Sequence, residues 1–179
     1  SRWRQKPTHN GALIMNAGAE GTEIGVVVKS VTRVNRAGEI EIFSKDDIHF
    51  QYRKTVFPPG DGVIVEAEIE LRKGDRAAIQ NAMDLYLKQR KEKQPLNLPN
   101  SGSIFKNPPG DKAGRLIESA GLKGYSIGDA AISIKHANFI VNKGCALARD
   151  VLKLIEHVQK TVKEKTGVEL ETEIIVTGV

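Results

Sequence analysis

Alternating apolar and polar residues in the first half of the chain predict a β-sheet. β-Branched residues between positions 25 and 44 flank a four-residue turn at 35–38, a pattern typical of a β-hairpin. Residues 63–71 alternate strictly, with three glutamates on one face and apolar residues on the other. The apolar set comprises Val63, Val65, Ala67, Ile69 and Leu71. We therefore expect a half-buried strand there, with its apolar face in the core and its glutamates in solvent.

The hydrophobic period lengthens to that of a helix between residues 75 and 93. Apolar residues recur there at i, i+3, i+4 and i+7, Asp75 stands where an N-cap is favoured, and Pro95 follows the end. The stretch 94–99 contains two prolines and is typical of a linker. These patterns predict two parts, residues 1–94 and residues 95–179.

The second part combines helix and strand patterns. Asp111 is expected to cap a short helix that stops at Gly121, and a longer apolar stripe predicts a helix that ends near Gly167. Residues 131–142 and 168–176 have the pattern of strands. Alternation places three glutamates of the last strand on one face, and these are Glu169, Glu171 and Glu173. The fold class expected from all these elements is α+β.

The loop at residues 100–110, called the serine loop below, carries the clearest candidate chemistry. It presents a hydroxyl, a cation and an amide on Ser103, Lys106 and Asn107. Gly102 permits backbone angles that other residues avoid, and the proline pair at 108–109 fixes the exit path. This combination favours binding of a phosphate or a sugar. An ordinary polar turn is the alternative.

Composition limits the remaining classes of function. The chain has 179 residues, 40% hydrophobic and 27% charged, which is typical of a globular protein. Its apolar runs are far shorter than the ~20 residues that cross a bilayer, so no membrane is expected and the cytoplasm is the default location. A single cysteine, Cys145, excludes an internal disulfide, and no metal site is expected. The net charge of +5 permits nucleic-acid binding, but 5% aromatic residues argue against it.

Several segments, taken together and in order, resemble one enzyme family. They lie at 15–21, 52–55, 100–110, 113–118, 121–124, 135–142 and 170–174. The chain is similar to UDP-N-acetylenolpyruvoylglucosamine reductase, the MurB family, and to its shorter second type. No segment before residue 16 is similar to the Gly-rich part of the family's flavin-binding domain, and residues 1–10 are left unassigned.

The resemblance implies a two-part enzyme that uses FAD as cofactor and NADPH as reductant. It implies reduction of UDP-N-acetylglucosamine enolpyruvate to UDP-N-acetylmuramate for peptidoglycan synthesis. Residues 1–94 would be the remaining C-terminal part of a two-lobed FAD-binding domain, and residues 95–179 a small α+β substrate-binding domain. The N-terminal half-domain then becomes an expected partner of this chain.

The resemblance also implies roles for individual residues. Ser103 matches the proton donor, Arg53 the cation that stabilises the carboxylate of the enolate, and Glu173 a carboxyl that polarises or protonates the intermediate. The flavin-binding positions are Asn16, Ala17 and Gly18. The substrate-binding positions are Tyr52, Lys106, Asn107, Lys135 and His136. The match implies that Glu173 is the buried glutamate of its strand, and a hydrogen-bonded structural histidine is the alternative for His136.

Two other functions remain open from the sequence. The chain could be a UDP-sugar-binding fragment, or an inactive relative, that binds no flavin. It could also be a basic nucleic-acid-binding protein, whose affinity would fall steeply with salt. Flavin uptake by the purified chain separates the enzyme from both.

Overall fold

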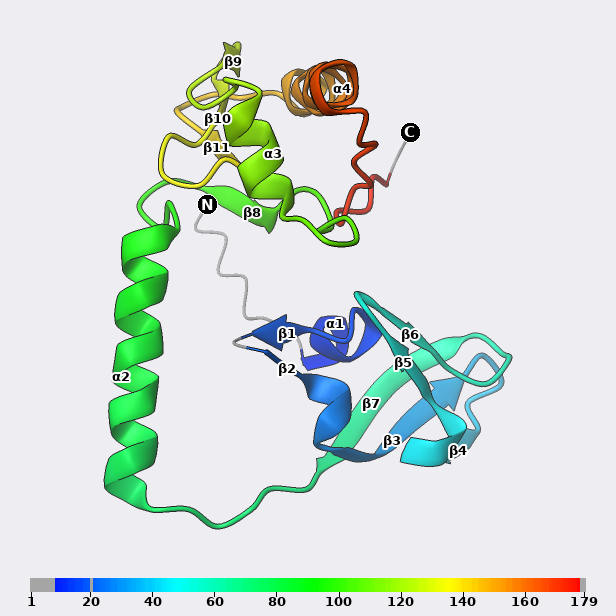
Figure 1. The fold of residues 1–179 in the computed structure, drawn as a ribbon. Coiled ribbons are helices and arrows are strands. Elements are labelled where there is room, and N and C mark those ends of the chain that lie inside the picture. Colours follow the sequence, from blue (N-terminus) through cyan, green and yellow to red (C-terminus); the bar gives the residue numbers. More distant parts are fainter. Residues whose placement is uncertain (1–8, 20, 178–179) are drawn as a thin grey trace. The chain divides into compact units, whose positions relative to one another are not determined.

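The computed structural model describes residues 9–19 and 21–177, and divides the chain into two compact units, residues 1–74 and 75–179 (Figure 1). Each unit combines helices and strands, which confirms the α+β fold class. The unit boundary precedes the helix at residues 76–93, whereas the sequence predicts a boundary after residue 94. The two units are described separately below.

The first unit is built on an antiparallel sheet of three strands, in the order β4-β3-β7. The predicted hairpin is confirmed: β3 (Val28–Asn35) pairs with β4 (Ile40–Ser44). The Asn35 side-chain oxygen closes its turn, because it accepts hydrogen bonds from the amides of Ala37 and Glu39, both at 3.0 Å. The Asn35 side chain thus supplies an acceptor to two amides that the turn would otherwise leave without a hydrogen-bond partner.

The third strand, β7 (Gly62–Ile69), contains an irregularity that overturns the predicted burial. Thr32 pairs with Glu66 but Arg33 pairs with Ile64, so Val65 is an extra residue on β7. Such a bulge shifts the alternation by one position, and therefore Ile64 and Ala67 both face the core. The other predicted inward residues are exposed: Val63, Val65, Ile69 and Leu71. The glutamates are exposed, as expected.

Short elements surround this sheet. They are α1 (His9–Ile14), β1 (Gly18–Ala19), β2 (Thr22–Glu23), η1 (Ile24–Val26), η2 (Lys45–Asp47), β5 (His49–Gln51) and β6 (Lys54–Val56). β1 pairs with β2 and β5 with β6, giving two small hairpins. The core of this unit is small, and its buried members are Leu13, Val28, Val31, Ile48 and Ile64.

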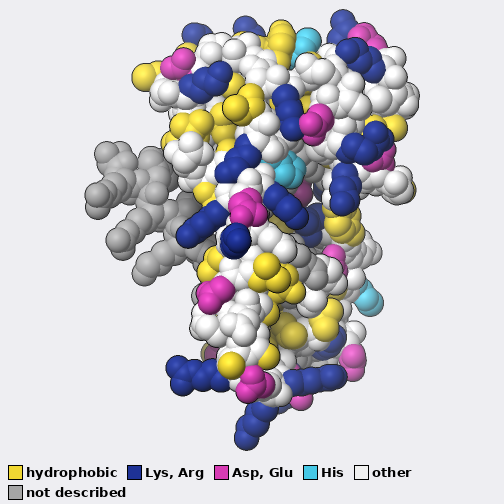
Figure 2. All heavy atoms as spheres, turned by 60° about the vertical axis from the view of Figure 1, so that its left-hand side comes forward, with side chains coloured by type: hydrophobic (Ala, Val, Ile, Leu, Met, Phe, Trp, Pro, Cys, Tyr) yellow, Lys and Arg dark blue, Asp and Glu magenta, His cyan; other side chains and the backbone are white. Residues whose placement is uncertain are grey.

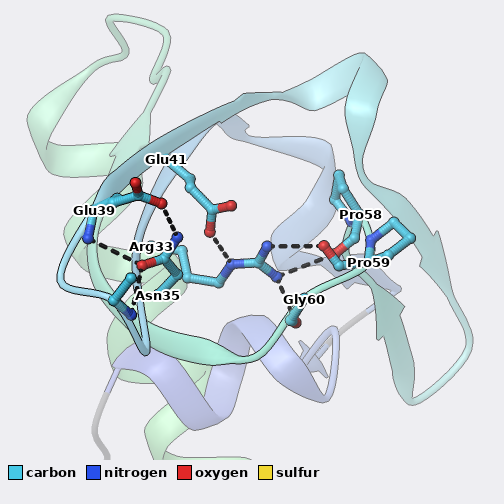
Figure 3. Close-up of polar contacts among 8 residues, drawn as sticks. Arg33, Asn35, Glu39, Glu41, Pro58, Pro59 and Gly60 are labelled. Carbon is cyan, nitrogen blue, oxygen red and sulfur yellow. Dashed lines mark hydrogen bonds and ion pairs between the residues drawn. The ribbon is translucent and has the colours of Figure 1, made fainter.

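A buried arginine ties the sheet to the chain that leaves β6. The Arg33 side chain donates to the Glu41 carboxylate at 2.8 Å and to the carbonyls of Pro58, Pro59 and Gly60 at 3.0–3.2 Å (Figure 3). Its guanidinium also lies over the Phe43 ring, 4.7 Å from the ring centre. A buried charge is tolerated only when it is paired and hydrogen-bonded in this way.

The second unit begins with the predicted helix, α2 (Arg76–Lys93). The Asp75 carboxylate accepts a hydrogen bond from the amide of Ala78 at 2.8 Å, which confirms the predicted N-cap. Ile79, Met83 and Tyr86 on its apolar stripe remain about half exposed. No residue of α2 is buried, so tertiary packing contributes little to this helix.

The body of this unit is a four-stranded antiparallel sheet with two helices. Its order is β8-β11-β10-β9, formed by β8 (Asn100–Ser103), β9 (Ser126–Ile127), β10 (Ala130–Ile132) and β11 (Phe139–Asn142). α3 (Ala113–Ser119) and α4 (Ala148–Thr166) pack against each other, and α4 also contacts β9 and β10. The predicted α4 stripe is confirmed, with Leu154, Ile155, Val158 and Val162 buried and Gly167 in the left-handed conformation after its end.

Two strand predictions in this unit are wrong. Residues 131–142 form two strands joined by a turn, because the Ser133 hydroxyl accepts hydrogen bonds from the amides of Lys135 and His136 at 3.1 and 3.3 Å. Residues 168–177, called the C-terminal segment below, form no regular strand and make one isolated bridge, between Phe105 and Thr172. This segment runs along the hydrophobic core, in which its Leu170 side chain is buried.

Candidate functional site

The serine loop is held at both ends of β8. The Asn100 side chain accepts from the Gly102 amide at 3.0 Å and donates to the carbonyls of Pro95 and Leu98 at 3.1 and 2.9 Å. Gly102 has a φ of 84°, the left-handed region that favours glycine. Ser103 pairs with Phe139 of β11 and is half-buried. The linker and the sheet therefore fix the backbone of this serine.

The C-terminal segment runs directly beside the serine loop. The Glu173 amide donates to the Ile104 carbonyl at 2.7 Å, and the Lys106 amide donates to the Glu171 carbonyl at 2.8 Å. Glu173 is half-buried whereas Glu169 and Glu171 are exposed, which follows the order that the resemblance implies. The structure therefore places Ser103 and Glu173 on adjacent stretches of backbone.

Lys106 has a second partner in the same segment. Its ammonium group forms an ion pair with the Glu171 carboxylate. The lysine side chain is largely covered while the glutamate is exposed to solvent. An anionic ligand at Lys106 would therefore share this ammonium group with Glu171, or displace it.

Asn107 rather than Asp111 caps α3. Its side-chain oxygen accepts a hydrogen bond from the Ala113 amide at 3.1 Å. Asp111 lies one residue outside the cap: it accepts from the Lys112 amide at 2.7 Å and pairs with Arg115. The hydrogen bond from Arg115 and the one from Lys112 lower the pKa of Asp111 to about 2. The predicted Asp111 cap is wrong because the loop brings Asn107 closer to the first free amide.

Replacing Asn107 by alanine should destabilise the second unit by about 1 kcal/mol, the usual loss when an N-terminal amide loses its side-chain partner. The Asn107→Asp variant is the matched control, because a carboxylate keeps the acceptor. Urea denaturation, read with hydrogen exchange of the Ala113 amide, measures both. Equal losses in the two variants would show that the acceptor is unimportant.

His136 is packed as a structural residue. Its Nδ1 accepts from the Asn138 amide at 3.2 Å, and its ring meets the Phe139 ring edge-on with centroids 4.8 Å apart. Burial lowers the pKa of His136 below its usual 6.5, the Lys123 charge acts in the same direction, and Glu118 opposes them. This geometry supports the hydrogen-bonded alternative for His136.

The lowered pKa of His136 predicts a loss of stability in mild acid. The unfolded chain takes up the proton more readily than the folded chain. The histidine's contribution is therefore complete above pH ~6.5 and falls as the pH drops through the lower pKa of the folded state. Unfolding free energies of the parent and of His136→Gln should converge between about pH 7 and about pH 5. A constant difference would contradict the assignment.

A pocket of about 560 Å³ lies between the linker and the strands β10 and β11. Three lysines stand around it, Lys91, Lys135 and Lys143, and we call it the three-lysine pocket. Among the residues that the structure describes, the lining includes the apolar side chains of Leu96, Leu98, Ile132 and Val141 and no carboxylate. The Lys135 ammonium donates to the Lys91 carbonyl at 2.5 Å. Figure 2 shows basic side chains interspersed with hydrophobic ones on the face that carries α2.

Lys91 and Lys143 were missed as candidates from the sequence. Lys91 belongs to the basic run at 88–93, which is typical of a solvated helix end, and Lys143 stands alone after β11. The basic run itself was the signal for Lys91. Only the fold brings Lys143 to the same pocket.

Arg53 and the flavin-matching residues meet in the first unit. Tyr52 and Arg53 form the two-residue turn between β5 and β6, and Arg53 has a φ of 54°. Its guanidinium lies over the Tyr52 ring, 5.0 Å from the ring centre. A Cβ added to Gly18 would lie 3.3 Å from Arg53 Nη1. Arg53 therefore packs against the hairpin that follows Asn16, while Ser103 and Glu173 belong to the second unit.

Other kinds of site find no support in the described residues. Within 9–19 and 21–177, no group of three or more His, Cys, Asp or Glu side chains is arranged to hold a metal ion. None of the described helices is both long and apolar enough to cross a membrane.

Comparisons with known proteins converge on one family. A family model, UDP-N-acetylenolpyruvoylglucosamine reductase, C-terminal domain, matches residues 94–177. UDP-N-acetylenolpyruvoylglucosamine reductase 2 of Symbiobacterium thermophilum is 48% identical over 171 residues, which are 96% of this chain and 56% of that protein. The reductase of Clostridium novyi is 48% identical over 168 residues, 94% of this chain and 55% of the relative.

The fold is shared as well. The crystal structure of UDP-N-acetylenolpyruvylglucosamine reductase (MurB) from Thermus caldophilus superposes with a TM-score of 0.79 at 37% identity. The match covers 92% of this chain and 58% of that one, so the chain spans little more than half the length of its relatives. On identity, coverage and fold together, the chain belongs to the UDP-N-acetylenolpyruvoylglucosamine reductase family.

Proposed function

We propose that this chain forms the substrate-reducing part of a UDP-N-acetylenolpyruvoylglucosamine reductase. The reaction converts UDP-N-acetylglucosamine enolpyruvate to UDP-N-acetylmuramate in cytoplasmic peptidoglycan synthesis, with FAD as cofactor and NADPH as reductant. The observation that carries the proposal is the pairing of the serine loop with the C-terminal segment, through Glu173 to Ile104 and Lys106 to Glu171. It brings the backbone of Glu173 to Ile104, the residue that follows Ser103, in a member of this family.

The residues of this chain have distinct tasks in that reaction. Bound flavin, once reduced, supplies the hydride that the substrate's double bond receives. The Ser103 hydroxyl holds the proton that the neighbouring substrate carbon takes up, and the fixed backbone at Gly102 orients it. Arg53 neutralises the substrate carboxylate, for which a planar guanidinium is suited. Glu173, whose amide donates to the Ile104 carbonyl next to Ser103, polarises the same group of atoms.

The segment that matches the flavin-binding positions, residues 16–18, is open to a flat ligand on its solvent-exposed side only. Ala17 and Ala19 are exposed and small, so a ring system can approach the backbone there. Asn16 is completely buried and faces the protein. Contact between this segment and flavin would therefore run through Ala17 and Gly18.

The three-lysine pocket suits the nucleotide end of the substrate. Its lysines can neutralise phosphates, and its apolar wall can hold a flat base. Lys135 belongs to this pocket, while Lys106 and Asn107 lie on the serine loop. We assign Lys135, Lys106 and Asn107 to the diphosphate of the substrate. We assign Tyr52, which precedes Arg53, to its enolpyruvyl end.

The N-terminal half of the flavin-binding domain is the proposed partner of the first unit. The outer face of the β4-β3-β7 sheet exposes Ile40, Ile42 and Val63, and the first two are about 70% accessible. Val34 pairs with both Ile40 and Val63, so these three side chains form one row across the sheet, and Ile42 follows two residues along β4. Apolar rows of this kind are usual where another part of a protein packs.

Titration of the purified chain with FAD and, separately, with UDP-N-acetylglucosamine enolpyruvate tests the proposal. The titration is repeated with the part of the Clostridium novyi reductase that this chain does not match. Flavin uptake with NADPH-dependent bleaching supports the reductase. Substrate heat without flavin uptake in either mixture would indicate a UDP-sugar-binding protein, and salt-sensitive nucleic-acid binding alone would overturn both.

A further inference from the structure

Asn16 is the most completely buried polar residue in the described part of the chain, and it bonds to Gln51, two residues before Arg53. Its side chain is fully shielded from solvent and its φ is 41°, a left-handed conformation that asparagine tolerates better than most residues. The amide nitrogen donates to Glu23 Oε2 at 2.6 Å and to the Gln51 carbonyl at 3.0 Å. The amide oxygen accepts from the Gly25 backbone at 3.1 Å.

These bonds use both donors of the Asn16 side chain. An asparagine amide has two N–H groups, and here they are committed to Glu23 and Gln51. Because the side chain is also buried, it presents no donor to a bound molecule. Its match to a flavin-binding position therefore needs another explanation.

Two of the three partners of Asn16 belong to β-hairpins, one of which carries Arg53 in its turn, and the third, Gly25, lies on η1. Glu23 lies on β2, and its Cγ would be 3.0 Å from a Cβ placed on Gly18, the same position that approaches Arg53 Nη1. Gln51 is the last residue of β5, immediately before the turn formed by Tyr52 and Arg53. Asn16 thus links the β1–β2 hairpin to the turn end of the β5–β6 hairpin.

We infer that Asn16 is a positioning residue for Arg53, acting through Glu23 and Gln51, and that Gly18 leaves the space in which the guanidinium lies. The inference rests on the proposed function only for the task of Arg53. The positioning itself is a property of the chain without ligands, in which Asn16 fixes the turn that carries Arg53. The buried Nε of Arg53 is the atom whose behaviour shows whether that turn stays fixed.

The test uses the 179-residue chain and the NMR signal of the Arg53 Nε–H group, assigned with Arg53→Lys. In Asn16→Ala, the exchange of this proton with solvent should accelerate at least about tenfold, since the loss of buried hydrogen bonds opens the turn locally. Asn35→Ala is the matched control. It also removes three side-chain hydrogen bonds of an asparagine, two accepted from backbone amides and one donated to Glu39, but at the turn between β3 and β4.

A second pair of variants distinguishes loss of the Asn16 contacts from general unfolding of the chain. Asn16→Asp places a carboxylate against Glu23, whereas Asn16→Asp with Glu23→Gln restores that bond with the donor on the other side. The double variant regains the bond to position 23 but not the one to the Gln51 carbonyl, so it should recover part of the Arg53 protection lost in the single one. Unchanged Arg53 exchange in Asn16→Ala, or equal effects of Asn16→Ala and Asn35→Ala, would overturn the inference.

Activity separates the inference from the proposed function. In the mixture with the Clostridium novyi part, Asn16→Ala should lower kcat while flavin affinity stays within about twofold, because Arg53 acts after binding. A loss of flavin affinity with unchanged kcat would return Asn16 to the cofactor site and overturn the inference. No turnover in the parent mixture, together with a changed Arg53 signal, would contradict the proposed function and leave the positioning role standing.

Discussion

Replacing Arg33 by methionine should lower the free energy of unfolding of the first unit by about 3–5 kcal/mol, the range seen when one partner of a buried ion pair is removed. The Arg33 residue is only 5% exposed. Its loss leaves the Glu41 carboxylate and three carbonyls without the donor that satisfies them. Methionine fills a similar space over Phe43 but donates no hydrogen bond. Urea denaturation, with hydrogen exchange along β3, measures the loss.

Arg36→Met is the matched control for Arg33. Arg36 follows the same strand and pairs with Asp61 at 3.1 Å, but the two side chains are 84% and 73% exposed. Exposed pairs contribute little, so this variant should stay within about 0.5 kcal/mol of the parent. Similar losses in both variants would mean that burial does not set the importance of Arg33.

Ser103→Ala should reduce turnover of UDP-N-acetylglucosamine enolpyruvate by about 10²–10⁴-fold, the usual contribution of a positioned proton donor. Bleaching of bound flavin by NADPH should be unchanged, because that half-reaction needs no proton from the serine. The measurement is stopped-flow absorbance in the mixture with the Clostridium novyi part, with each half-reaction followed separately.

Ser101→Ala provides the comparison for Ser103. Ser101 lies two residues earlier on β8, is exposed, and makes no described bond to the C-terminal segment. Its variant should retain parental rates in both half-reactions. Equal losses in the two serine variants would point to distortion of β8, and full activity of Ser103→Ala would remove the serine from the reaction.

Features set by neighbouring residues were predictable from the sequence. The α2 and α4 helices and the β3–β4 hairpin follow from period, caps and turn residues within a few positions. The bulge at Val65 was not, because it depends on pairing with β3 and reverses which apolar residues are buried. Likewise, Asn107 displaces Asp111 as the cap only because the folded loop brings it to the start of α3.

The candidate site divides in the same way. The serine loop stands out in the sequence because its hydroxyl, cation and amide are close together along the chain. The contact of Ile104 with Glu173 is invisible to periodicity, since alternation gives all three glutamates of the C-terminal segment one environment. Lys143 joins Lys91 and Lys135 only through the antiparallel return of β11.

The bridge between the serine loop and the C-terminal segment also sets an order in biosynthesis. Lys106 and Glu171 are 65 positions apart along the chain. At about 5–20 residues per second, a ribosome needs about 3–13 s to make the residues between them. During that interval Ile104 and Phe105, which are buried in the folded protein, exist without the backbone that later flanks them. This loop is therefore completed only after the C-terminal segment has been made, and chaperones that bind nascent apolar chain have time to reach it.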